Sequence, residues 1–222
     1  MPRIVALLRT VDRVLFGPLR EQHLRILERE IVGTCETLLD VGCGATSPIQ
    51  RFSKRLRHSV GVDSFEPYLE RSRAAGIHSE YRLVDALQIE QHFAPRSFDC
   101  VLASELAEHL PKQDGLRLMH MMEKIAKRKV IIVTTNGFLP QGGCDDNVRQ
   151  AHLCGWSVAE MRDLGYRVIG IHGWKPLRGA YGLPRWRPYA LWDRISLLSQ
   201  VLAKRCPTCA FEMLCVKDIN PE

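Results

Sequence analysis

The chain has 222 residues, enough to bury the core of one domain without disulfides or a structural metal. Hydrophobic residues make up 45% of it and charged residues 25%, a balance that excludes an intrinsically disordered protein. The formal net charge of +6 permits an anionic partner but does not require one. Because the basic residues are scattered along the whole chain, we expect most of them on solvated helix faces.

The eight cysteines indicate a reducing compartment, and we expect the protein in the cytoplasm. They do not follow the spacing of a disulfide framework. Five of them lie singly in apolar runs, at Cys35, Cys43, Cys100, Cys154 and Cys215. The C-x-x-C formed by Cys206 and Cys209 lacks the second pair of a four-ligand zinc site, so we predict no bound metal.

An amphipathic helix is predicted near the N-terminus, because apolar residues recur at helical spacing between Ile4 and Leu15. Asp12 and the absence of a small-residue cleavage site argue against a signal peptide. No apolar run in the sequence approaches the roughly 20 residues that cross a bilayer, so we expect at most a peripheral contact with a membrane.

Short β-rich apolar runs alternate with amphipathic helical patterns from residue 36 onward, as expected of parallel βαβ units. Strands are predicted at residues 37–41, 59–62, 80–83, 98–103, 130–134, 167–171 and 211–216. Helices are predicted at residues 49–56, 67–75, 112–127 and 158–164. The alternation indicates an α/β fold built on a doubly wound sheet.

Glycines and carboxylates follow the first three predicted strands. In the run LLDVGCGAT, Gly42 and Gly44 allow the backbone to turn sharply and to approach a ligand at the carboxyl edge of the sheet. The second strand ends in Asp63, whose carboxylate can accept both hydroxyls of a ribose at this spacing. Asp85 ends the third strand, within reach of an adenine amino group. With Asp40, these carboxylates favour a nucleoside-containing cofactor over the helix caps that single aspartates often form.

These motifs, with the fourth strand FDCVLASE and the following LAEHLP, resemble the class I methyltransferases that use S-adenosylmethionine (SAM), in the group described as methyltransferase type 11. The resemblance is closest over residues 37–110 and continues more loosely, in segments similar to a largely uncharacterised bacterial and archaeal branch. It implies a Rossmann-like, doubly wound, seven-stranded sheet whose last strand is antiparallel. We place a SAM-binding methyltransferase domain at residues 35–222. The amphipathic pattern of the N-terminus indicates a helical cap at residues 1–34, and a stretch rich in Gly, Pro, Arg and aromatic residues indicates an insertion at 173–205 before the last strand.

The resemblance further implies which residues bind SAM. Its methionine half would be lined by Asp40, Gly42, Cys43 and Gly44, its ribose by Asp63, and its adenine by Asp85 and Ala86. The stretch that contains Leu102, Ser104 and Glu105 would pass beneath the sulfonium. One departure is Thr46, which stands where the family motif G-x-G-x-G has its third glycine. A nicotinamide-dependent dehydrogenase fits less well, because its motif needs a third small residue at the position of Ser47.

Methyl transfer is an in-line displacement at an activated carbon, so the protein chiefly aligns the nucleophile and excludes water. An oxygen nucleophile also needs its proton removed, and His109 in EHLP and His152 in RQAHLCGW are the candidate bases. The alternative for both is a histidine that orders a turn or bonds to the backbone. Asn136, after the fifth strand, is a candidate acceptor contact or an ordinary turn residue.

The insertion interleaves aromatic and basic residues, among them Trp174 and Arg178, which we expect to contact the acceptor. Such a surface can cover the active site as a lid, lie at a membrane interface or bind nucleic acid. Nucleic acid is the less favoured partner, because the Asn/Asp-Pro-Pro-aromatic signature of base-amino methylation is absent after the fourth strand.

The sequence therefore predicts a SAM-dependent O-methyltransferase of a saccharide, a glycolipid or a secondary metabolite. Two alternatives stay open: N- or C-methylation of another small molecule, and a non-catalytic protein that keeps the SAM-binding fold. The intact Gly42, Gly44 and Asp63 argue against the second alternative, because a degenerate copy would be free to lose them.

Overall fold

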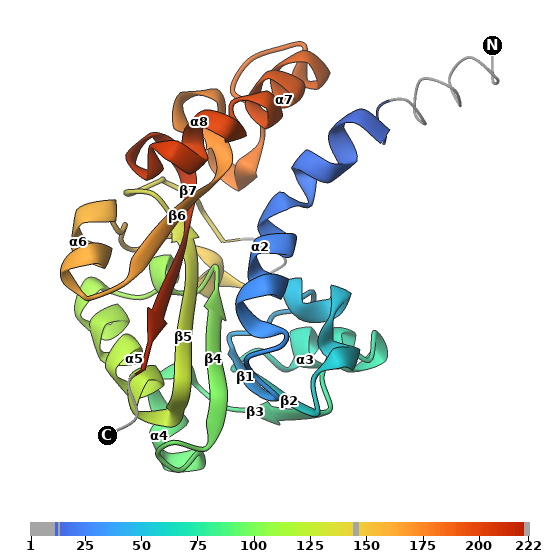
Figure 1. The fold of residues 1–222 in the computed structure, drawn as a ribbon. Coiled ribbons are helices and arrows are strands. Elements are labelled where there is room, and N and C mark those ends of the chain that lie inside the picture. The colour runs from blue at the N-terminus through green and yellow to red at the C-terminus, as the bar shows by residue number, and fades with distance from the viewer. Residues whose placement is uncertain (1–11, 13, 144–146, 220–222) are drawn as a thin grey trace.

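The computed structural model describes residues 12, 14–143 and 147–219, which include a seven-stranded sheet with helices on both faces (Figure 1). The strands are β1 (Thr37–Val41), β2 (His58–Asp63), β3 (Glu80–Leu83), β4 (Phe98–Ser104), β5 (Ala126–Thr135), β6 (Arg167–Trp174) and β7 (Ala210–Asp218). Their order across the sheet is β3-β2-β1-β4-β5-β7-β6. Only the pairs that include β7 are antiparallel. The predicted sheet with a reversed last strand is confirmed.

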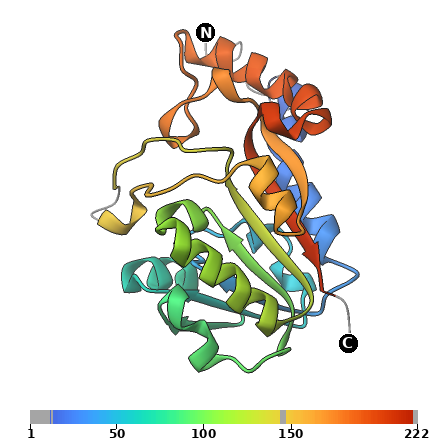
Figure 2. The same cartoon turned by 90° about the vertical axis from the view of Figure 1, so that its left-hand side faces the viewer.

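The two faces of the sheet bury different residues of the same strand, because successive side chains point to opposite sides. Leu38 of β1 packs in a layer that includes α2 (Gln22–Ile31). Leu39 packs in the other layer, with α4 (Ile89–His92), α5 (Lys112–Ile125) and α6 (Val158–Asp163), the layer that faces the viewer in Figure 2. All five residues of β1 are buried, as expected of a central strand covered on both faces.

The structure corrects two predicted elements. The helix expected at residues 49–56 is replaced by two short 3₁₀ turns, Pro48–Arg51 and Ser53–Arg55, because Phe52 between them leaves the helical region (φ −133°, ψ 2°). β5 begins at Ala126, directly after α5, rather than at residue 130, because a run of basic residues conceals the start of the strand. The other predicted helices are present, including α3 (Glu66–Ala74).

The predicted N-terminal amphipathic helix lies mostly outside the described residues. Two of its apolar residues, Val14 and Leu15, are described, and both are exposed. Residues 14–20 are helical and lead toward α2. Across the described part of the chain, no helix is both long enough and apolar enough to cross a membrane.

The segment between β6 and β7 forms α7 (Tyr189–Leu198) and α8 (Gln200–Arg205), which lie above the sheet in Figure 1. Gly173 of β6 makes the close approach of α7 feasible. It has a positive φ of 79°, and a Cβ at this position would lie 2.2 Å from the carbonyl oxygen of Ser196. The segment therefore packs on β6 instead of projecting as a free loop.

The segment between β5 and α6 also returns to the sheet. Trp156, near its end, is fully buried, and its Nε1–H donates to the carbonyl oxygen of Ala107 at 3.2 Å. The backbone of Trp156 forms an isolated parallel bridge with Asn136, at the end of β5. The N–H of Leu153 donates to the carbonyl oxygen of Glu108 at 2.8 Å, so this segment lies against the turn that follows β4.

Candidate active site

Two cavities lie where the predicted motifs converge. We call the first the glycine cavity: it has a volume of about 410 Å³, and its lining includes Gly42, Gly44, Asp63, Asp85 and Arg149. We call the second the histidine cavity: it has a volume of about 580 Å³, and its lining includes His23, His109, His152, His172 and Glu212. Glu105, His109 and Gln150 line both cavities. The two cavities therefore meet at these residues.

β1 leads into the glycine cavity through a turn in which Gly42 (φ +69°) and Gly44 (φ +60°) adopt left-handed conformations. The N–H groups of Gly42 and Cys43 donate to the carbonyl oxygen of Val62 in β2. A Cβ at Gly44 would meet no atom within 4 Å. The turn therefore leaves open space for a ligand against its backbone.

Asp63 is fixed in the wall of this cavity by backbone donors. Its Oδ2 accepts the N–H of Gly44 and its Oδ1 the N–H of Phe65, each at 2.9 Å. Burial raises the pKa of Asp63, and these backbone donors partly oppose the rise. Each carboxylate oxygen has a second lone pair. The side chain can therefore still accept hydrogen bonds from ligand hydroxyls.

Asp85 and Ala86 line the same cavity. Oδ1 of Asp85 accepts the N–H of Leu87 at 2.9 Å, and Oδ2 lies 3.3 Å from the guanidinium of Arg149. Arg149 also donates to the hydroxyl of Ser64 at 2.9 Å. It therefore connects the loops that follow β2 and β3. Sequence reasoning missed Arg149, because it comes from the segment after β5.

Three residues predicted to face the cofactor, Asp40, Cys43 and Leu102, are buried and line neither cavity. Successive side chains of a strand point to opposite faces of the sheet, and that of Leu102 packs in the hydrophobic layer that includes α2. Asp40 accepts a hydrogen bond from the hydroxyl of Ser47 at 2.5 Å, so it supports the glycine turn from within. Ser104 lines the histidine cavity and not the glycine cavity.

Asp40 and His78 form a buried titratable pair below the glycine turn. Burial raises the pKa of Asp40 to about 7, and the charge of Asp63 adds to this rise. His78 Nε2 lies 3.5 Å from Oδ2 of Asp40, and burial lowers the pKa of His78 to about 4. Both side chains are therefore favoured in their neutral forms between these two pKa values.

The histidine cavity is lined by three of the four non-glycine residues that have positive φ in the described part of the chain. These are Glu105 (φ +52°), His172 (φ +62°) and Tyr181 (φ +56°). Such conformations cost about 1–3 kcal/mol each, and they cluster at functional sites where the surroundings enforce them. His172 also lies at a register shift between β6 and β7, a bulge of the kind that redirects a side chain.

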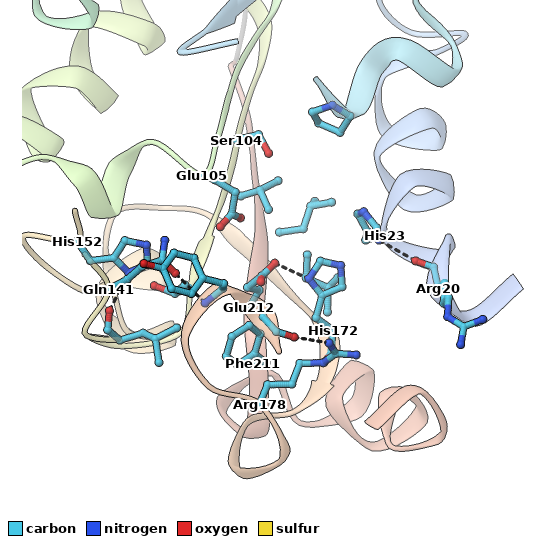
Figure 3. Close-up of a pocket in the computed structure, with 18 of the residues that line it drawn as sticks. Arg20, His23, Ser104, Glu105, Gln141, His152, His172, Arg178, Phe211 and Glu212 are labelled. Carbon is cyan, nitrogen blue, oxygen red and sulfur yellow. Dashed lines mark hydrogen bonds and ion pairs between the residues drawn. The ribbon is translucent and has the colours of Figure 1, made fainter. Parts of the chain in front are cut away.

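Figure 3 shows that His172 and Glu212 point toward each other in this cavity. Nδ1 of His172 lies 2.5 Å from Oε2 of Glu212, and the ring of His23 packs edge-on against His172 with centroids 4.3 Å apart. A neutral histidine whose Nδ1–H is held by a carboxylate keeps a lone pair on Nε2 and can take a proton there. Sequence reasoning missed this pair, although Glu212 is a charged residue within the apolar run of β7.

His109 and His152 lie side by side, with ring centroids 4.8 Å apart. Nδ1 of His109 lies 3.2 Å from the carbonyl oxygen of Ala151, and Nδ1 of His152 lies 2.8 Å from that of Leu139. Because a carbonyl oxygen only accepts, each Nδ1 carries the proton and each Nε2 the lone pair. Burial lowers the pKa of His152.

Acidic side chains gather where the cavities meet. Glu105 is exposed as a whole, but desolvation of its carboxyl group in the cavity wall raises its pKa, and the carboxylates of Glu212 and Glu108 add to this rise. Glu108 is fully buried. The junction is therefore unfavourable for negative charge unless a cation or a proton is present.

Of the three predicted acceptor contacts, only Arg178 lines the histidine cavity. Its guanidinium also bonds to Asp193, at 3.2 Å. Asn136 is buried, and its amide donates to the carbonyl oxygens of Pro207, Thr208 and Ala210, so it fixes the turn before β7. Trp174 lies outside both cavities. Neither Asn136 nor Trp174 has the acceptor-facing position that the sequence suggested.

Asp40→Asn should change how stability depends on pH. Because the pKa of Asp40 is raised by folding, its contribution to the free energy of unfolding is complete below its ordinary value of 3.8 and is lost as the pH rises through about 7. Asparagine can still accept from Ser47 but cannot ionise. As the pH rises from about 5 to about 8, we expect the free energy of unfolding of the variant to increase by about 2–3 kcal/mol relative to that of the wild type.

Urea unfolding of the wild type and of Asp40→Asn at about pH 5 and about pH 8 measures this change in relative stability. His78 contributes the opposite pH dependence to both proteins, so it largely cancels in the comparison. Equal stability differences at the two pH values would show that Asp40 is ionised in the folded chain throughout this range.

Comparison with known proteins agrees with this geometry. Residues 39–134 match the family model described as a methyltransferase domain. A ubiquinone biosynthesis O-methyltransferase of Pseudomonas paraeruginosa is 29% identical over 174 residues, which cover 67% of this chain and 72% of that protein. A SAM-dependent methyltransferase structure from Archaeoglobus fulgidus has a TM-score of 0.57 and 16% identity, covering 95% of this chain and 99% of that chain.

The structure of magnesium protoporphyrin IX methyltransferase from Synechocystis PCC 6803 with bound SAM has a TM-score of 0.51 and 13% identity, covering 91% of this chain and 80% of that chain. The shared fold places a glycine turn and strand-end carboxylates at the carboxyl edge of the sheet, and the family model spans these same motifs. Residues 39–134 therefore form a methyltransferase domain, and these findings together support a class I methyltransferase that uses SAM.

Proposed function

We propose that this methyltransferase methylates a hydroxyl oxygen of a small, partly apolar acceptor. The observation that carries the proposal is the junction of the two cavities at Glu105, His109 and Gln150. A cofactor in the glycine cavity and an acceptor in the histidine cavity would meet there. The displacement itself needs chiefly the alignment of the acceptor oxygen with the methyl group, which two adjoining sites would provide.

The glycine cavity has the features that SAM needs. The open backbone at Gly44 leaves room for the ligand, and the carboxylates of Asp63 and Asp85 offer acceptors for the ribose hydroxyls and the adenine amino group. Gly42, which has no side chain, and Ala86, which has only a methyl group, also line this cavity. When bound, SAM supplies a methyl group activated by a sulfonium.

The lining of the histidine cavity supports an acceptor with both polar and apolar parts. Apolar side chains from several elements line it, among them Leu139, Leu197, Phe211 and Leu214. Histidine, glutamate and arginine side chains line the rest. A glycolipid or a lipophilic secondary metabolite suits this mixture better than a bare saccharide. The O-methyltransferase name of the Pseudomonas relative supports oxygen as the methylated atom.

We assign the activation of the acceptor hydroxyl to His109 and His152. His109 lines both cavities, and His152 lies against it. Their backbone hydrogen bonds fix both rings and leave Nε2 as the free nitrogen of each. The His172–Glu212 pair in the same cavity supplies a proton acceptor.

Gly44→Val should weaken SAM binding by about tenfold or more, measured by calorimetry, because the side chain would enter the space left for the ligand. The matched control is Gly33→Val. Gly33 also has a positive φ, of 92°, and open space around a built Cβ, but it lines neither cavity. Both variants should lose stability to backbone strain. Equal SAM affinities in the two variants would place the ligand away from the turn.

His109→Ala and His152→Ala should each lower turnover by about 10²–10⁴-fold and leave SAM affinity nearly unchanged. The assay uses labelled SAM and an extract of lipids and phenolic compounds from the producing cell, and the methylated atom is identified by NMR. His120→Ala, which removes an exposed histidine of α5, is the control. Wild-type turnover in both cavity variants, or a methyl group on nitrogen or carbon, would contradict the proposal.

We further propose that α7 and α8 contact a membrane surface, from which a lipophilic acceptor can enter. Their exposed apolar side chains are Tyr189, Leu191, Leu198, Val201 and Leu202. Exposed basic residues accompany them, including Lys204 and Arg205. Apolar anchors with basic neighbours suit the headgroup region of an anionic bilayer. Leu197 of α7 lines the histidine cavity, so the surface lies next to the acceptor site.

Leu202→Glu should weaken binding to vesicles of phosphatidylglycerol and phosphatidylcholine by about tenfold or more, since burying a leucine contributes about 1.5–3 kcal/mol. Leu83→Glu, at an exposed leucine of β3, is the matched control and should bind like the wild type. Co-sedimentation measures the binding. Equal losses in the two variants would point to general charge repulsion and exclude a specific role for α8.

A further inference from the structure

A buried cluster of Glu108, His109 and His152 lies at the junction of the two cavities. Each side chain offers one atom that could bind a metal ion, and these three atoms all lie within 4.8 Å of one another. Glu108 is fully buried, and each histidine is 8% exposed. Metal–nitrogen and metal–oxygen bonds are about 2.0–2.2 Å long, so small side-chain movements would bring all three atoms to one cation.

Only one of the two carboxylate oxygens of Glu108 accepts a hydrogen bond from the described residues. Its Oε2 accepts a hydrogen bond from the hydroxyl of Thr134 at 2.8 Å. Its Oε1 is also buried, but it has no hydrogen-bond partner in the described part of the chain. An unpaired buried acceptor costs about 1–3 kcal/mol, and more when it is charged. A cation bound to Oε1 would remove this cost.

The two histidines are arranged as metal ligands commonly are. Metal-binding histidines usually donate their other ring N–H to a carboxylate or a backbone carbonyl, which fixes the tautomer and the ring orientation. His109 and His152 each direct Nδ1 to a backbone carbonyl oxygen. Thr134 orients the carboxylate of Glu108 in the same way. All three ligands therefore have their supporting contacts in place.

We propose that Glu108, His109 and His152 bind a divalent first-row transition cation, with Glu105 as an additional oxygen ligand. Two imidazole nitrogens favour Fe²⁺, Co²⁺ or Zn²⁺ over Mg²⁺ and Ca²⁺, which prefer oxygen ligands, and the carboxylate oxygens of the site also suit Mn²⁺. The strained backbone of Glu105 holds its side chain at the junction of the two cavities.

This proposal departs from the absence of a metal that the sequence predicted. That prediction considered Cys206 and Cys209, which belong to a different part of the chain, before β7. The ligands proposed here come from the turn after β4 and from the segment after β5. Only the folded chain brings them together.

The role of the cation in catalysis rests on the proposed function. The acceptor hydroxyl oxygen would bind the cation, which lowers the pKa of the hydroxyl. The hydroxyl proton passes to Nε2 of His172, whose Nδ1 faces Glu212. The oxygen–methyl bond forms as the sulfur–methyl bond breaks, and the electron pair of that bond stays on sulfur, which leaves S-adenosylhomocysteine. His109 and His152 then act through the cation and not as bases.

The test measures Mn²⁺ binding to the chelator-treated full-length chain, without SAM or acceptor, by loss of the electron paramagnetic resonance signal of free Mn²⁺. We expect one ion per chain. Glu108→Gln and His152→Ala should each weaken binding by about 100-fold or more. Thr134→Val removes only the hydroxyl that orients Glu108, and should weaken binding by about 10–100-fold. His120→Ala should bind Mn²⁺ like the wild type.

Thermal unfolding and SAM calorimetry establish that each variant is folded. No binding by the wild type, or unchanged binding by folded Glu108→Gln and His152→Ala, overturns the cation site. O-methylation at full rate by chelator-treated protein overturns its catalytic role. Stoichiometric Mn²⁺ binding that both ligand variants lose, without detectable O-methylation, supports the site and counts against the proposed function alone.

Discussion

The buried indole of Trp156 is the contact on which the carboxyl edge of the sheet depends. Its Nε1–H is held by the carbonyl oxygen of Ala107, and its ring occupies the space that Gly115 of α5 leaves, where a Cβ would lie 2.7 Å from the ring. The ammonium of Lys112 lies 3.7 Å from the centroid of the same ring. These contacts fix the end of a segment that would otherwise be an open loop. Because Trp156 is fixed, the preceding residues are held as cavity walls: Gln150 lines both cavities, Arg149 the glycine cavity and His152 the histidine cavity.

Several hydrogen-bond acceptors lie close together at the junction of the cavities, where few hydrogen-bond donors are available. The carboxylates of Glu212 and Glu108 lie close enough to Glu105 to help raise its pKa, and the two neighbouring histidines use their N–H groups on backbone carbonyls. Replacing buried charged groups by apolar ones is often neutral or stabilising. The presence of such groups beside the proposed methyl-transfer site, next to a strained backbone at Glu105, is consistent with a role in function.

The sequence determined the sheet well because strand signals are local. Each of the seven predicted strands exists, and the glycine turn with Asp63 and Asp85 lies where the spacing predicted. The direction in which an individual side chain points was harder to predict from the sequence. Leu102 and Cys43 were assigned to the cofactor from their positions in a motif, but strand alternation and the tight turn bury both. A count of alternate positions from buried Leu38 along β1 would have indicated that Asp40 also points inward.

The acceptor side could be predicted much less, because it is assembled from distant parts of the chain. His172 and Glu212 come from β6 and β7, which pair only in the folded sheet. The positive φ of His172 has no sequence signal, since non-glycine residues rarely adopt it. Asn136 was a candidate acceptor contact by its amide side chain, but in the folded chain that amide bonds to the turn before β7.

Thr46 stands at the position of the third glycine in the family motif, and in this chain a different feature stabilises the turn. A third glycine in the motif would permit a positive φ, yet Thr46 is not among the described residues with positive φ, so its position does not need glycine. The turn is instead restrained by the Ser47 hydroxyl, which donates to buried Asp40. The restraint is a hydrogen bond to a buried carboxyl group whose pKa burial raises to about 7, a titratable support that a glycine-based turn would lack.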